Sequence, residues 1–68
     1  MKVKEVLELP IAKDNLDAIV EIKDRINAIS VRGRVGDLCL GLFEDAEIWN
    51  FEFIDPADRT PIIRIYVR

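Results

Sequence analysis

From Ile29 to Arg68 the sequence reads ISVRGRV-GD-LCLGLF-EDAE-IWNFEFI-DPADRTP-IIRIYVR. In four segments apolar residues alternate with other residues, which is typical of strands with one buried face. Three short connections separate them: Gly36-Asp37, in which Gly supplies the positive φ of a two-residue hairpin turn, the acidic segment 44–47, and the proline-containing segment 55–61. The sequence therefore predicts a four-stranded antiparallel meander with strands at about 29–35, 38–43, 48–54 and 62–68.

The lengths of these connections also predict which side chains share a face of the sheet. Counting outward from each turn places Glu52 opposite Arg64 and Trp49 beside Val67. The predicted core face consists of Val31, Val35, Leu38, Leu40, Leu42, Trp49, Phe51, Phe53, Ile63, Ile65 and Val67. With Trp49 in that core, Trp49→Ala is expected to lower the free energy of unfolding by about 3 to 5 kcal/mol.

Residues 1–28 are compatible with two kinds of element. Apolar residues follow the candidate helix cap Asp14 at intervals of three and four, which favours a helix over about 14–28, whereas the β-branched run Ala18–Ile22 also fits a strand. Residues 3–9 are expected to form a first strand, although Val3, Val6 and Leu7 also fit a helical stripe. The predicted fold class is α+β, with the helix covering the sheet. The alternative is a small all-β barrel or sandwich.

The composition limits the function. The chain has 68 residues, 50% hydrophobic and 34% charged, with a net charge of −3, a single Cys and no His, which predicts one small domain over residues 1–68. Because His is the usual general base near neutral pH and the commonest metal ligand, we expect no enzyme activity, no catalytic residue, no metal and no cofactor. Cys39 cannot form an internal disulfide and is expected to be a partly covered strand residue. The apolar segments are too short for a membrane span or a signal peptide, so we expect a cytoplasmic protein without membrane contact.

Residues 42–58 carry a resemblance to a known family. They contain an acidic turn followed by the alternating segment Ile48–Asp55. The segment resembles the C-terminal half of an uncharacterised family of very small prokaryotic β-rich proteins, in which the strand has the form I-V-G-I-E-I-L-D-A. Ala46 and Asn50 stand where the family has Gly, and Pro56 stands where it has Ala. The family has no established activity, and the resemblance implies only a β-rich fold and a suspected pairing with small toxins.

Three functions follow from the predicted second face and edge of the sheet. The first is a non-catalytic interaction or self-association module, because the strand at 62–68 would be an edge with unpaired backbone groups and the second face would carry large apolar side chains. Its partner would be another copy, forming a symmetric dimer, or another protein. The candidate partner-binding residues are Phe43, Ile48, Ile54, Ile62, Arg64 and Arg68.

The second function is binding of a phosphate ligand or nucleic acid at the polar centre of that face. The candidate ligand-binding residues are Arg32, Arg34, Asn50, Glu52 and Tyr66. Nucleic acid is the less favoured partner, because sheet-based RNA readers work on a basic background and the isoelectric point here is about 4.8. The third function is masking of a basic protein, such as a small toxin, by the seven acids between residues 35 and 58, a segment without Lys or Arg.

Overall fold

The computed structural model describes residues 1–24, 26, 28–57 and 59–68 of the chain. Positions 25, 27 and 58 and the side chain of Leu42 lie outside the described part, and so do the predictions that concern them. The described elements, in chain order, are α1 (Val3–Val6), α2 (Pro10–Lys13), β1 (Ile19–Lys23), β2 (Ile29–Arg34), the 3-10 helices η1 (Val35–Asp37) and η2 (Gly41–Phe43), β3 (Ile48–Ile54) and β4 (Ile62–Val67).

The strands form one mixed sheet in the order β2-β1-β4-β3. Two antiparallel hairpins, β1 with β2 and β3 with β4, meet along β1 and β4, which run parallel to each other. The fold is therefore α+β, but the predicted purely antiparallel meander is wrong. The expectation that the last strand is a sheet edge is also wrong, because β4 has a neighbour on each side and the edges are β2 and β3.

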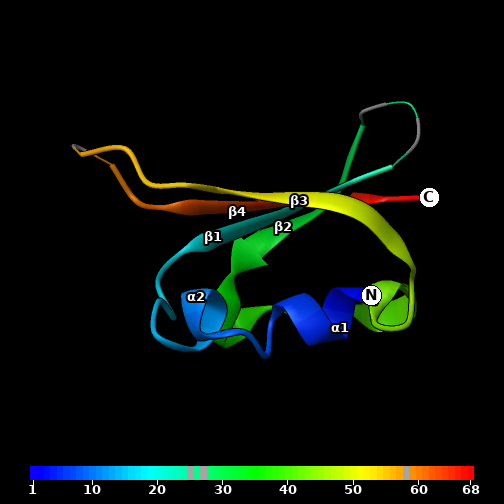
Figure 1. The fold of residues 1–68 in the computed structure, drawn as a ribbon, viewed down its shortest axis with the longest axis horizontal. Coiled ribbons are helices and arrows are strands. Elements are labelled where there is room, and N and C mark those ends of the chain that lie inside the picture. The colour runs from blue at the N-terminus through cyan, green and yellow to red at the C-terminus, as the bar shows by residue number, and fades with distance from the viewer. Residues whose placement is uncertain (25, 27, 58) are drawn as a thin grey trace.

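The helical segments all lie on one side of the sheet (Figure 1). Between them and the sheet is the core, whose largest fully buried side chains are Ile22, Ile63, Ile65, Val3, Val6 and Val20. None of the described helices lies over the opposite side of the sheet, which we call the outer face (Figure 1). Within the described ranges, no helix is long and apolar enough to cross a membrane.

The hairpin of β3 and β4 has the predicted register over most of its length. Phe51 pairs with Ile65 and Glu52 with Arg64, as the count from the proline-containing turn predicted. Phe53 has the predicted neighbour and points to the helix side, but it is 38% exposed because the hairpin extends beyond α2 (Figure 1). The turn of a hairpin sets its register, so the pairing of β3 with β4 could be predicted from the local sequence alone.

A β-bulge at the start of β3 reverses the predicted orientation of Trp49. The register shifts between Ile48 and Asn50, so that Ile48 rather than Trp49 lies opposite Val67. One extra residue in a strand moves the side chains beyond it to the other face. Ile48, predicted to be exposed, is therefore buried in the core, and Trp49, predicted to be in the core, is 60% exposed.

The predicted strand at 38–43 is not a strand. After β2 the chain continues beside the segment that precedes β1, because the amide of Val35 donates to the Ala18 carbonyl and the amide of Gly36 to the Leu16 carbonyl, each at 3.0 Å. The 3-10 helices then carry the chain across the helix side of the sheet (Figure 1). The positive φ, 55°, belongs to Gly41 and not to Gly36.

The alternation of apolar residues from position 38 to 40 nevertheless corresponds to alternating burial of their side chains. Leu38 and Leu40 pack against the core, while Cys39 between them is exposed and lies outside any strand, which corrects the expectation of a partly covered strand residue. Alternating burial does not require sheet hydrogen bonds, because an extended segment packed on a core alternates in the same way.

The N-terminal expectations are also corrected. The predicted helix over 14–28 is replaced by β1, and its apolar residues do not form one packing face, since Leu16, Ile26 and Ile29 are 59%, 82% and 50% exposed. The predicted strand at 3–9 is replaced by α1 and α2, with Pro10 at the first position of α2, where its missing amide hydrogen costs no helical bond. The alternative for residues 14–28, a strand on the β-branched run Ala18–Ile22, is confirmed by β1.

Candidate functional site

The outer face is built from three rows of side chains that run across the strands. Each row joins residues that are partners in the sheet register, taken in the order β2, β1, β4, β3. The apolar row is Arg34, Ile19, Ile62 and Ile54; the charged row is Arg32, Glu21, Arg64 and Glu52; the aromatic row is Lys23, Tyr66 and Asn50, with Trp49 in the bulge beside Asn50. No described helix covers these rows, so a partner can reach them (Figure 1).

Glu21 is a buried carboxylate at the centre of the charged row. Only 6% of the residue is exposed, although it lies on the uncovered side of the sheet. Its Oε1 accepts hydrogen bonds from Nε and Nη2 of Arg64, both at 3.2 Å, and its Oε2 lies 3.2 Å from Nε of Arg32. The two arginines therefore shield the carboxylate from water and neutralise it from both sides.

Arg64 turns toward Glu21 rather than toward Glu52. The predicted register, with Glu52 opposite Arg64, is confirmed, but the hydrogen bonds of the guanidinium go to the other neighbour. The hydrogen bonds with Glu21 raise the pKa of Arg64 above its usual range. Glu52 is left exposed, with a long hydrogen bond of 3.5 Å from the Tyr66 hydroxyl.

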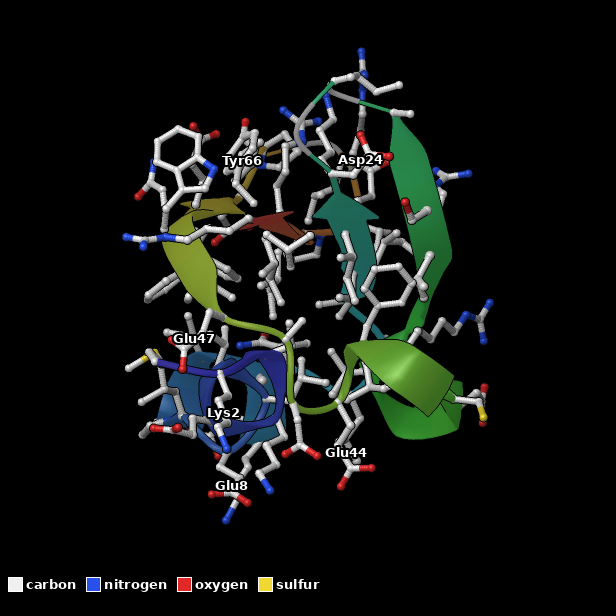
Figure 2. The ribbon with its side chains drawn as sticks, turned by 90° about the vertical axis from the view of Figure 1, so that its right-hand side faces the viewer. Lys2, Glu8, Asp24, Glu44, Glu47 and Tyr66 are labelled. Atoms are coloured by element: carbon white, nitrogen blue, oxygen red, sulfur yellow. The ribbon has the colours of Figure 1, made fainter. Side chains whose placement is uncertain are left out.

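The aromatic row contains two aromatic rings that contact each other at a tilt. The ring centroids of Trp49 and Tyr66 are 5.4 Å apart, with an angle of 43° between the ring planes. Tyr66 points away from the helices, as Figure 2 shows. Tilted pairs at this distance are favourable, so the pair holds two large rings in place at the surface before any partner binds.

Because Trp49 is mostly exposed, we expect Trp49→Ala to lower the free energy of unfolding by less than about 1.5 kcal/mol, the range of one surface aromatic contact. This replaces the larger loss predicted from the sequence. Urea denaturation followed by circular dichroism measures it. A loss of about 3 kcal/mol or more would mean that Trp49 belongs to the core after all.

The apolar row lies at the opposite end of the outer face. Ile19, Ile62 and Ile54 are neighbours on successive strands, and all three are half-buried. Beside them is an open depression of about 360 Å³ lined by Asp17, Ile19, Arg34 and Thr60. The outer face thus has contact surface at both ends and paired charges in the middle.

The structure separates the six predicted partner-binding residues. Ile54, Ile62 and Arg64 lie on the outer face. Phe43 packs against the core and Ile48 belongs to it, so the expected position of these two side chains on an exposed face is wrong, whereas their role in partner binding stays a prediction. Arg68 is exposed after β4, and its amide donates to the Glu47 carbonyl at 3.2 Å.

The predicted ligand-binding residues, in contrast, all lie on one face of the sheet, although in different rows. Arg32, Arg34, Asn50, Glu52 and Tyr66 all belong to the outer face. Sequence reasoning missed the other members of that face, namely Ile19, Glu21, Lys23 and Trp49. The available signal was a single acid within the β-branched run of residues 18–22, because an acid at the centre of a buried strand needs a partner on each adjacent strand.

The acidic segment before β3 lies near the N-terminus, on the helix side of the molecule (Figure 2). Asp45 lies 3.0 Å from Nζ of Lys4 and 3.8 Å from Nζ of Lys2, and the terminal amine lies 3.4 Å from Glu47. The hydrogen bond with Lys4 lowers the pKa of Asp45 and raises the pKa of Lys4. These acids therefore meet basic groups of the same chain.

The outer face offers contact area, and the carboxylate at its centre is neutralised by two arginines. In the part of the chain that the structure describes, no group of three His, Cys, Asp or Glu side chains is placed to hold a metal ion. Comparison of the chain with family models, with curated proteins and with solved structures found no match. The resemblance of residues 42–58 stays a prediction.

Proposed function

We propose that this protein is a non-catalytic binding module that recognises another protein molecule through the outer face of its sheet. The observation that carries the proposal is the uncovered aromatic pair: Trp49 is 60% exposed, yet it is held against Tyr66 on a face that no described helix covers. Rigid aromatic side chains are enriched at protein interfaces because they bury much area at little cost in side-chain entropy. Ile54 and Ile62 extend the apolar surface to the other end.

The charged row suits this function because its centre is already neutralised. Glu21 is paired on both sides, so a partner covering Arg32 and Arg64 does not have to supply a carboxylate for them. The same pairing makes a phosphate or nucleic-acid ligand the weaker candidate. Arg32 of the predicted ligand site and its neighbour Arg64 are engaged with Glu21, and the net charge of −3 repels a polyanion.

Masking of a basic partner by the acids between residues 35 and 58 is also a weaker candidate, because two of these acids are paired within the chain. Asp45 and Glu47 lie beside Lys2, Lys4 and the terminal amine, so much of their charge is balanced within the chain. Electrostatic attraction of a basic protein depends on unbalanced surface charge.

The proposal is tested with matched variants of two equally exposed apolar residues. Trp49→Asp places a charge in the aromatic pair, whereas Leu16→Asp changes a residue that is 59% exposed and lies before β1, outside the outer face. Immobilised protein is incubated with host extract and with a separately tagged second copy. We expect at least one protein to be retained by the wild type and by Leu16→Asp and to be lost with Trp49→Asp. If all three retain the same proteins, binding through the outer face is ruled out.

A further inference from the structure

The charges of the charged row alternate in sign across the whole sheet. In the order of the strands, Arg32 on β2 is followed by Glu21 on β1, Arg64 on β4 and Glu52 on β3. The row therefore reads plus, minus, plus, minus from one edge of the sheet to the other. A strongly acidic or strongly basic partner would meet like charge at half of these positions.

An alternating row of four is complementary to itself under one particular symmetry. A two-fold axis parallel to the strands, passing between β1 and β4, exchanges the left and right halves of the row. It places the exposed Arg32 of one copy over the exposed Glu52 of the other, while Glu21 stays paired with Arg32 and Arg64 of its own chain at the centre. A two-fold axis perpendicular to the strands would instead place each charge over its own equivalent, so charge selects the first arrangement.

The other two rows agree with the same axis. In the apolar row it places Ile19 over Ile62 of the partner, so that aliphatic side chains meet, and it places Arg34 over Ile54 at the two edges of the sheets. In the aromatic row it places Lys23 over Tyr66, where an ammonium group above a ring is favourable. These contacts follow from the register, since Ile19 pairs with Ile62 and Lys23 with Tyr66 within one sheet.

We propose that the partner recognised by the outer face is a second copy of this chain, packed sheet to sheet about a two-fold axis parallel to the strands between β1 and β4. This rests on the proposed function, of which it names the partner. The aromatic and aliphatic side chains supply the affinity, and the charged row fixes the orientation and register of the two sheets. The face is small compared with standard interfaces, so the dimer forms reversibly at micromolar or higher concentration.

The test uses charge reversals that are repulsive alone and attractive together. In a dimer of Arg32→Glu chains two acids face each other at both symmetric contacts, and in a dimer of Glu52→Arg chains two bases do. A mixed dimer of one chain of each kind has opposite charges at both contacts. Glu52 is exposed, so Glu52→Arg is expected to retain the fold. Arg32→Glu removes one of the two basic partners of Glu21 and is expected to be less stable. Circular dichroism therefore establishes that each variant is folded before its sedimentation is compared with that of the wild type. Glu8→Lys is the control, since it reverses a charge on the helix side (Figure 2).

Sedimentation equilibrium is measured from about 10 µM to 1 mM, a range suited to a weak dimer. The wild type and Glu8→Lys are expected to approach twice the monomer mass of 7.8 kDa. Each single reversal is expected to weaken the dimer by about tenfold or more, and an equal mixture of the two is expected to recover it. A wild type that stays monomeric to 1 mM overturns the proposal, as do reversals without effect or a mixture that recovers nothing.

Trp49 provides an independent readout, because it is the only tryptophan of the chain. Its emission is expected to move to shorter wavelength as the wild type dimerises, and a doubled mass without that shift would place the interface elsewhere. Failure of the dimer proposal can be distinguished from failure of the proposed binding function. If the wild type is monomeric but another protein is retained in a Trp49-dependent manner, the outer face binds a partner and that partner is not a second copy.

Discussion

Ile65→Ala is expected to lower the free energy of unfolding by about 3 to 4 kcal/mol, within the range for aliphatic core truncations, and to leave much of the protein unfolded at 37 °C. Ile65 is fully buried in β4, the strand that joins the two hairpins, and it pairs with Ile22 on one side and Phe51 on the other. Removing it opens a cavity where the two halves of the sheet meet. A domain of 68 residues has a free energy of unfolding of only a few kcal/mol, so the loss caused by one such cavity is comparable to the total.

The matched control is Ile62→Ala in the same strand. Ile62 has the same side chain but lies on the outer face and is half-buried, so we expect a loss of about 1 kcal/mol. Urea denaturation at low micromolar protein concentration measures both variants without a contribution from association. Equal losses in the two variants would mean that the two faces of β4 are not as described.

The part of the fold that the sequence revealed is the part fixed by local interactions. The hairpin of β3 and β4 follows from one turn and two alternating strands, and its predicted pairing of Phe51 with Ile65 is found in the structure. The parallel pairing of β1 with β4 joins residues more than forty positions apart, as in Ile22 with Ile65. No turn connects these strands directly, so counting from turns cannot detect the pairing.

Two further errors have specific physical causes. The bulge at Trp49 leaves no mark in the apolar pattern, because both Ile48 and Trp49 are large and apolar and either could have been buried. The segment from Ile19 to Ile22 satisfies helical and strand spacing alike, and the choice depends on whether it has a neighbouring strand on each side, as β1 has. One of those neighbours, β4, is distant in the sequence, so the outer face could be predicted only in part.

Glu21→Gln is expected to lower the free energy of unfolding by about 2 to 3 kcal/mol, less than the 3 to 5 kcal/mol typical of breaking a fully enclosed ion pair, because Arg32 can turn toward water. Arg64 is more confined: its side chain is 27% exposed, against 62% for Arg32. The amide introduced by this substitution keeps the shape of the carboxylate but cannot neutralise two guanidinium groups. Glu52→Gln, a change of the same kind in the same row, affects an exposed carboxylate and is expected to cost no more than about 0.5 kcal/mol.

A double-mutant cycle separates the interaction energy of the Glu21–Arg64 ion pair from the other effects of each substitution on stability. If the cost of Glu21→Gln comes from leaving Arg64 without its carboxylate, then Arg64→Met should relieve it, and the double variant should be more stable than the sum of the single losses predicts. We expect a coupling of about 1 to 3 kcal/mol between Glu21 and Arg64, and less than about 0.5 kcal/mol between Glu52 and Arg64. Urea denaturation of the variants gives both values. Equal couplings would mean that Arg64 divides its charge between the two acids, and the central role of Glu21 in the outer face would be lost.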